Sequence, residues 1–382
     1  MREKADAVVI GGGIIGMAAA FYLARAQYGK IVLLERDSLT GTGSTSKAAG
    51  GIRAQFSNRV NIKMSMLSEK LFCQFKEDTG QEALFDQVGY MFLLSRPEDV
   101  ESFYLSVELQ RSLGLKVDIL KADDIARLAP HVRLDDIHSA TFCADDGLAD
   151  PHEFLSGYEK AARNLGVEIE LETEVTGLTR TGDRITEVIT NRGNIACGMV
   201  VNATGAFGSQ IGQMIGVDLP VQPIRRQCVT TGELDFVRPD FPMVVDVASG
   251  LYFHKESKGL LLGWADPDVK PSTDISIDPD YTDNILERAL DRIPQLETAE
   301  VANQWAGLYE VTPDHRAIIG YEPKVEGLFH VLGFSGHGLM QAPAAGLICS
   351  QILTDQKPEI DISDLSPARF SKGKIQKETN VI

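Results

Sequence analysis

The first 35 residues alternate apolar runs with glycine in an order that predicts strand, turn, helix and strand. Residues 7–10 form a short apolar run rich in β-branched side chains, and residues 31–34 form another. Between them, residues 18–26 carry the small and apolar side chains of a helix that is buried against a sheet. Strand and helix patterns in this order predict a βαβ unit at the start of the chain.

The predicted turn of this unit carries glycines with the spacing G-x-G-x-x-G, at Gly11, Gly13 and Gly16. In dinucleotide-binding units the first glycine permits a tight turn, the second lets the backbone approach a pyrophosphate, and the third lets the helix pack against the strand. Glu35 ends the second strand, where an acid can accept hydrogen bonds from ribose hydroxyls. The unit is therefore predicted to bind a dinucleotide, with the phosphates at the helix N-terminus.

An uncharged run over residues 7–24 is the feature that favours a different interpretation, a membrane or signal segment. Its three consecutive glycines disfavour a continuous helix. The second strand, which ends on an acid, favours a soluble βαβ unit. No other stretch approaches membrane-spanning length, so we expect no transmembrane segment and no processing.

The rest of the chain mixes helical and strand patterns. Apolar residues at helical spacing predict helices over residues 58–79, 98–113, 121–128, 153–165, 282–293 and 342–353, the last with Pro343 in its first turn. Short apolar runs predict strands over residues 89–95, 199–202, 227–231, 243–247, 251–254, 260–264 and 327–332. The closely spaced strands between residues 219 and 303 predict an antiparallel sheet.

Three further segments put small residues where a ligand could approach the backbone. Residues 41–51 form a loop with three consecutive hydroxyl side chains, the Ala203–Gly205 turn follows a strand, and the Gly333–Gly338 turn precedes a helix. The alternatives are a flexible linker for the first and a tight connection with a surface histidine for the last. The last turn alone does not decide between a flavin-contacting loop and a plain connection.

Composition narrows the class of protein. A chain of 382 residues suggests two domains, or one domain with a large insertion. A net charge of −17 disfavours nucleic acid and anionic membranes as partners. The five cysteines are scattered, which predicts neither a metal site nor a disulfide framework and fits a cytoplasmic location. The polar tail from Ser371 is expected to fray.

Five blocks of the sequence together resemble the D-amino-acid-oxidase-type FAD-dependent oxidoreductases, and most of all the sarcosine oxidase, dimethylglycine dehydrogenase and L-proline dehydrogenase β-subunit branch. The blocks are VVIGGGIIGMAAAFYLA at the start, GSTSKAAGGIRAQFS from Gly43, VVNATGAF from Val200, WAGLYEVTPDHRAIIG from Trp305 and GFSGHGLMQAP from Gly333. The resemblance implies an α/β (α+β) fold: a Rossmann-like FAD-binding domain of the glutathione-reductase type and a second, antiparallel-sheet substrate domain. It assigns residues 1–88, 146–218 and 319–382 to the first domain, and residues 89–145 and 219–318 to the second.

The resemblance also implies a set of cofactor-contacting residues. They are Gly11, Gly13, Ile14, Ile15, Gly16, Glu35, Arg36, Ser44, Thr45, Ser46, Gly50, Gly51, Ile52, Val175, Ala203, Thr204, Gly205, Gly307, Gly333, Ser335, Gly336, His337, Gly338, Leu339 and Met340. Gly307 stands where the sarcosine oxidases carry the cysteine that tethers FAD, so the FAD is expected to be noncovalent.

The activity that the resemblance implies is oxidation of a secondary or tertiary amino acid, such as L-proline or sarcosine, by hydride transfer from the carbon next to nitrogen to flavin N5. Leu261 and Met340 stand where oxidases carry lysines. This favours a dehydrogenase that passes electrons to a quinone, a flavin or a protein, and it makes a hetero-oligomer with another subunit possible. The alternatives are a peroxide-forming glycine, sarcosine or D-amino-acid oxidase and a flavin-binding assembly subunit without turnover.

The substrate carboxylate needs a cationic partner, for which Arg53 in the segment GGIRAQF is the best candidate. A structural or flavin-contacting role for this arginine is nearly as plausible. Tyr252 and Tyr309 are candidates to shape the pocket and to hydrogen-bond the substrate, although either could be a core tyrosine. His337 is expected near the flavin.

Overall fold

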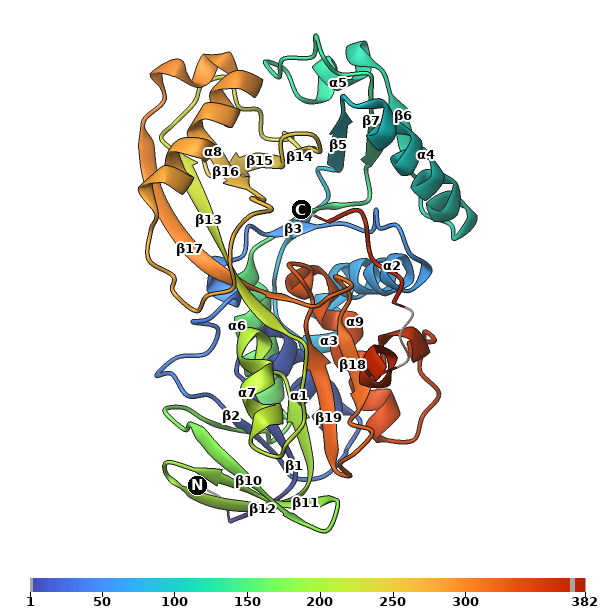
Figure 1. Ribbon diagram of the computed structural model, residues 1–382, viewed down its shortest axis with the longest axis vertical. Helices are drawn as coiled ribbons and strands as arrows, with labels where there is room; N and C mark the ends of the chain where they lie inside the picture. The colour runs from blue at the N-terminus through green and yellow to red at the C-terminus, as the bar shows by residue number, and fades with distance from the viewer. Residues whose placement is uncertain (1–2, 372–374, 382) are drawn as a thin grey trace.

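The computed structural model describes residues 3–371 and 375–381 and builds them around two eight-stranded sheets, one at each end of the molecule (Figure 1). The predicted βαβ unit is confirmed: β1 (Lys4–Ile10) and β2 (Ile31–Leu34) pair in parallel on either side of α1 (Ile14–Arg25). Ala7 lies opposite Ile31, and all four residues of β2 are buried. Such continuous apolar strands are typical of a parallel sheet that is covered on both faces.

The first sheet continues around this unit in the order β10-β11-β12-β1-β2-β9. The added strands are β9 (Glu168–Glu170), β10 (Val175–Thr181), β11 (Arg184–Thr190) and β12 (Gly193–Asn202). Two later strands extend the sheet beside the end of β12: β19 (Leu328–Leu332) pairs with it in parallel, and β18 (Ile318–Tyr321) pairs with β19.

The second sheet has the order β17-β13-β16-β15-β14-β5-β7-β6. Its strands are β5 (Tyr90–Leu94), β6 (Asp118–Leu120), β7 (Ser139–Cys143), β13 (Gln222–Thr231), β14 (Met243–Asp246), β15 (Leu251–Glu256), β16 (Gly259–Trp264) and β17 (Val301–Val311). The strands predicted between residues 219 and 303 pair antiparallel with one another, and the parallel pair joins β14 to β5, which lies outside that range. A small third sheet joins β3 (Gly51–Ile52), β8 (Gly147–Ala149) and β4 (Phe85–Asp86).

The helices that follow α1 lie close to their predicted positions, with two corrections. These helices are α2 (Arg59–Cys73), α3 (Phe75–Thr79), α4 (Pro97–Ser112), α5 (Ala122–Leu128), α6 (Pro151–Asn164), α7 (Gly208–Gln213), α8 (Pro279–Arg292) and α9 (Gly338–Leu353). The helix expected over residues 58–79 is broken at Gln74 into α2 and α3. Helix α9 begins four residues before the predicted start, so Pro343 lies inside it rather than in its first turn.

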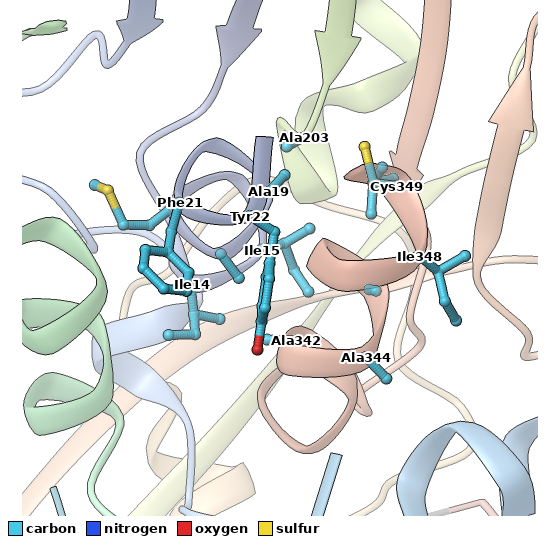
Figure 2. Packing of buried hydrophobic residues seen from close by; sticks show 14 of the residues in the cluster. Ile14, Ile15, Ala19, Phe21, Tyr22, Ala203, Ala342, Ala344, Ile348 and Cys349 are labelled. Atoms are coloured by element: carbon cyan, nitrogen blue, oxygen red, sulfur yellow. The ribbon is translucent and has the colours of Figure 1, made fainter. Parts of the chain in front are cut away.

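Helices α1 and α9 pack against each other beside the first sheet, and their contact is central to the larger apolar core (Figure 2). Ile15, Ala19 and Tyr22 lie on the side of α1 that faces α9 in that view. The helices can approach closely because Gly346 has no side chain. A Cβ at this position would lie 2.7 Å from the backbone carbon of Ala18.

The end of the described tail is anchored to the molecule, so the expectation that it frays is wrong for Glu378 and Asn380, whereas residues 375–377 and Thr379 are exposed. Glu378 is 1% exposed and Asn380 is 2% exposed. The Glu378 carboxylate accepts hydrogen bonds from Ser57 and from the side-chain amides of Asn58 and Asn61 at the start of α2. Within residues 3–371 and 375–381, none of the helices combines the length and the apolar character that a bilayer-spanning helix needs.

Gly346→Ala should destabilise the protein through the α1–α9 contact. Alanine favours a helix interior by about 1 kcal/mol over glycine. Its methyl group would, however, meet the backbone of Ala18, and overpacking costs about 1–3 kcal/mol. We expect a lower midpoint of thermal unfolding than in the wild type. The control is Gly198→Ala, because a Cβ at Gly198 meets nothing within 4 Å. Equal midpoints for both variants would contradict the proposed contact.

Candidate functional site

A cavity lies between the two sheets, where the turns of the first face the strands of the second. Its walls come from the turn after β1, the end of β2, the loop around residues 41–51, the turn after β12, the second sheet and the start of α9. The four expected catalytic residues all line it: Arg53, Tyr252, Tyr309 and His337. Elements distant in the sequence therefore meet at one site.

Most of the expected cofactor-contacting residues also line this cavity. They are Gly11, Gly13, Ile14, Ile15, Glu35, Arg36, Ser44, Thr45, Gly50, Gly51, Val175, Ala203, Thr204, Gly205, Gly307, Gly336, His337, Gly338, Leu339 and Met340. Five others do not belong to the lining: Gly16, Ser46, Ile52, Gly333 and Ser335.

Each of these five has a structural reason for its place. A Cβ at Gly16 would collide with the Gly11 carbonyl, so this glycine serves helix–strand packing. The Ser46 hydroxyl donates to the carbonyl of Thr42 within its own exposed loop. Ile52 is fully buried in the apolar core. Gly333 N donates to Glu310 Oε2, and Ser335 Oγ accepts from Thr312 N, which places both behind the turn that reaches the cavity.

The turn after β1 has the shape that a bound pyrophosphate needs. Gly11 has φ +108°, and a Cβ there would lie 2.5 Å from the Ala203 carbonyl oxygen. At Gly13, by contrast, a Cβ would meet only Thr45 Oγ1, at 3.2 Å, among the neighbouring protein atoms. The space beside Gly13 therefore opens toward the cavity, as expected where the backbone approaches a ligand.

The carboxylate of Glu35 is fixed at the end of β2 by backbone donors. Its Oε2 accepts from Gly12 N at 2.7 Å, and its Oε1 accepts from Asp37 N at 3.0 Å. A carboxylate has about four acceptor positions, so both oxygens keep lone pairs for ribose hydroxyls. Glu35, the residue predicted to bind the ribose, therefore lines the cavity in a fixed orientation.

The hydroxyl side chains of the loop around residues 41–51 have partners within the protein. Ser44 Oγ donates to the Leu308 carbonyl at 2.7 Å, which ties the loop to β17. Thr45 Oγ1 accepts from Ile14 N at 3.0 Å and keeps its own proton for another acceptor. The Thr45 hydroxyl can therefore still donate to a phosphate, whereas the Ser44 hydroxyl is occupied.

The second sheet forms the opposite wall, and here the sequence analysis missed several residues. Tyr90, Arg226, Cys228 and Met243 line the cavity together with Tyr252 and Tyr309. Alternation along β13 puts Arg226 and Cys228 on one face, but the sequence does not show which face meets the cavity. The Tyr252 hydroxyl lies 3.5 Å from Cys228 Sγ. The Tyr309 ring lies against Gly336, where a Cβ would come within 2.5 Å of it.

Arg53 is a buried cation without a described anionic partner. Arg53 is only 1% exposed. Nη1 donates to the Gln55 carbonyl at 2.8 Å, and Nη2 donates to the Asn380 carbonyl at 2.6 Å. Its guanidinium carbon lies 4.0 Å from the centre of the Phe56 ring. Nε is buried and has no hydrogen-bond partner among the described residues.

A buried carboxyl group, Asp146, holds the segment that carries Arg53, and a second one, Glu69, lies beside Asp146. Asp146 accepts from Ala54 N at 3.0 Å and from the Gln55 side-chain amide at 2.9 Å. Burial raises the pKa of Asp146 above its ordinary value. Burial and the neighbouring Asp146 carboxyl raise the pKa of Glu69 further. Glu69 is therefore the member of this pair that keeps its proton.

Two other titratable groups line the cavity beside the start of α9. Burial, together with the Arg53 cation, lowers the pKa of His337 well below its ordinary value, so its imidazole is neutral at pH 7. The His337 ring stands nearly perpendicular to that of Phe56, with their centres 4.7 Å apart. Burial raises the pKa of Glu310 to about 7. Near the start of α9, Arg53 is therefore the group whose charge does not depend on pH near neutrality, unlike Glu310.

Comparisons with known proteins agree on one family. The chain matches the model of the FAD dependent oxidoreductase (DAO) family over residues 6–352. It is 29% identical to rat mitochondrial dimethylglycine dehydrogenase, over 97% of this chain and 45% of that protein, and so spans under half of that relative. It is also 29% identical to the FAD-dependent oxidoreductase domain-containing protein 1 of Xenopus laevis, over 100% of this chain and 85% of that protein.

Among solved structures, the chain is similar to that of L-proline dehydrogenase from P. horikoshii. The two superpose with a TM-score of 0.92 at 30% sequence identity, and the match covers 98% of this chain and 100% of the other. The likeness therefore extends over both large sheets and the cavity between them.

Gly13→Ala should reduce the FAD content of the purified protein. Its added methyl group would occupy the space where the pyrophosphate approaches the backbone, while within the fold it would meet only Thr45 Oγ1, at 3.2 Å. We expect a folded protein that has lost most of its yellow flavin absorbance, with Gly198→Ala as the control that keeps it. Wild-type flavin content in the Gly13 variant would show that the cofactor does not lie against this turn.

Proposed function

Because the chain belongs to the FAD-dependent oxidoreductase family, we propose that it oxidises a secondary or tertiary amino acid, of the proline or sarcosine type. The observation that carries the proposal is Arg53, a buried cation on the cavity wall with no described anionic partner. A substrate carboxylate would supply the missing charge. The dimethylglycine and L-proline dehydrogenases to which the chain is similar are named for amino acids with substituted nitrogen.

The residues of the wall suit the binding of such a substrate. Arg53 would hold the carboxylate, and the Tyr252 and Tyr309 hydroxyls would donate or accept hydrogen bonds beside it. Met243 and Met340 supply apolar surface that excludes water from the reacting carbon. The bound FAD would supply the acceptor for the hydride that leaves the carbon next to nitrogen. No side chain needs to act as a base if the amine enters in its neutral form.

The structure supports noncovalent attachment of the FAD. Gly307 lines the cavity on β17, where it crosses the loop around residues 41–51. A Cβ at Gly307 would lie 2.5 Å from Lys47 Cβ. A tethering side chain is absent at this position, and the side chain of Lys47 leaves little room for one.

We also propose the division into FAD-binding residues 1–88, 146–218 and 319–382 and substrate-binding residues 89–145 and 219–318. In its favour, the first sheet takes its strands from the former ranges, apart from Ile318 at the start of β18, and the second sheet takes all of its strands from the latter. A partner subunit and a cytoplasmic location stay predictions.

The electron acceptor is proposed to be a quinone, a flavin or a protein rather than oxygen. Leu261 on β16 is 2% exposed and belongs to an apolar cluster with Cys228 and Tyr252 of the cavity wall. It offers no cation at the position where the resemblance places the lysine that would stabilise developing superoxide. The peroxide-forming oxidase and the assembly subunit without turnover remain the alternatives.

Arg53→Lys should raise KM for proline or sarcosine by about tenfold or more, because a hydrogen bond to a charged group contributes about 1.5–3 kcal/mol. Lysine keeps the charge but loses the planar fork. Steady-state kinetics with an artificial dye as acceptor would measure the change. Arg225→Lys is the matched control, because Arg225 pairs with Asp278 and does not line the cavity. Unchanged kinetics in the Arg53 variant would show that the substrate carboxylate binds to another residue.

The reduced wild-type enzyme should react with oxygen roughly 100-fold more slowly than with a dye, which is the scale on which a preorganised charge acts. Leu261→Lys should raise the oxygen rate, most clearly at low pH because burial lowers the pKa of a lysine. Stopped-flow reoxidation of the flavin would measure both rates. A wild-type enzyme that makes peroxide as fast as it reduces a dye would be an oxidase.

A further inference from the structure

A second arginine that the sequence analysis did not single out faces the same cavity as Arg53. Arg226 lies on β13, opposite Gly307 of β17, and it lines the wall together with Tyr309. Its guanidinium carbon lies 5.5 Å from the centre of the Tyr309 ring. The cross-strand neighbour Gly307 has no side chain that could pair with it.

Arg226 has no described counter-charge. Its Nη1 donates to the carbonyl of Arg225 at 3.2 Å, and its Nε is buried without a hydrogen-bond partner. No carboxylate of residues 3–371 or 375–381 lies within ion-pair distance of its guanidinium. The adjacent Arg225, by contrast, pairs with Asp278 at 2.8 Å.

The Tyr309 hydroxyl is close enough to both Arg226 and Arg53 to feel the charge of each. Burial raises the pKa of this hydroxyl, and the charges of Arg226 and Arg53 both act to lower that pKa. Both guanidinium groups therefore act on the same hydroxyl at the cavity wall. Glu310, which lines the same cavity, accepts from Gly333 N instead of pairing with either arginine.

We propose that the cavity accepts a secondary amino acid with a second carboxylate, and that Arg53 and Arg226 bind one carboxylate each. This rests on the proposed function for the oxidation itself. A substrate with one carboxylate would leave one partly desolvated cation without a partner, which is unfavourable. The chain has a net charge of −17, so two unpaired arginines at one cavity are a local arrangement that favours a dianion.

Binding can be tested without turnover, on the FAD-loaded protein. Thiodiacetate and (methylthio)acetate form a matched pair, because both replace the amine by sulfur and they differ by one carboxylate. Titration followed by the flavin absorbance should show that thiodiacetate binds at least about tenfold more tightly, the scale of one charge-assisted hydrogen bond. Arg226→Met should abolish this preference, and Arg226→Lys should restore part of it.

Arg225→Met is the control, and it should keep the preference because its own partner is Asp278. Equal affinities of the wild-type protein for the two sulfur compounds would overturn the inference. An Arg226→Met variant that binds both compounds equally more weakly would also overturn it, because Arg226 would then bind the carboxylate that the two compounds share. So would a variant that loses its FAD, because Arg226 would then bind the cofactor.

Turnover gives a second, separate measurement. Iminodiacetate and sarcosine share one skeleton and differ by the second carboxylate, which iminodiacetate carries across the nitrogen from the first. N-methylaspartate instead carries both carboxylates on the same side of the nitrogen. We expect at least one of the two diacids to reduce the flavin with a kcat/KM at least about tenfold above that of sarcosine. If neither these amines nor proline reduces the flavin, the proposed oxidation fails, while the sulfur compounds still decide the role of Arg226.

Discussion

The cavity depends on one close crossing, where β17 passes over the segment of residues 44–47. Three contacts define it: Ser44 Oγ donates to the Leu308 carbonyl, Trp305 Nε1 donates to the Lys47 carbonyl, and the side chain of Lys47 fills the space beside Gly307. The segment follows the βαβ unit, and β17 is the edge strand of the second sheet. The crossing thereby fixes the distance between the phosphate-binding turn and the wall that carries Tyr309.

The charges of the site are set by local burial rather than by the net charge of the chain. Arg53 is held by backbone carbonyls of Gln55 and Asn380, which orient a guanidinium without neutralising it. The Asp146 carboxylate sits behind the same segment, but its hydrogen bonds go to Ala54 and Gln55. An acidic protein can in this way present a cation to a small anion, because the interaction depends on contact distance and on the low dielectric of the wall.

The parts of the fold that could be predicted from the sequence are those that depend on neighbours in the chain. The βαβ unit follows from apolar periodicity and from glycine spacing, both of which act within 35 residues. The second wall depends on pairing between distant strands, such as β13 with β17 and β14 with β5. Tyr90 and Arg226 could not be assigned to the cavity for this reason, since the sequence does not show which face of a strand meets it.

The packed tail was missed for a different physical reason. Polarity predicts exposure only when the polar groups lack partners inside the protein. Glu378 finds its partners in Ser57, Asn58 and Asn61, more than 300 residues away, and its burial brings the Asn380 carbonyl to Arg53. A segment that looks disordered by composition thus becomes part of the support for the expected substrate anchor.

Helices α1 and α9 give the cavity its rigidity. The N-terminal ends of both helices face the cavity, through Gly13 to Ile15 in the first and Gly338 to Met340 in the second. Their bodies pack closely where Gly346 meets the backbone of Ala18. A helix N-terminus favours nearby negative charge, and here two such ends keep a fixed separation. The phosphates and the flavin ring of a bound FAD can therefore be stabilised at the same time. Neither helix can shift without disrupting the apolar core that α1 and α9 share.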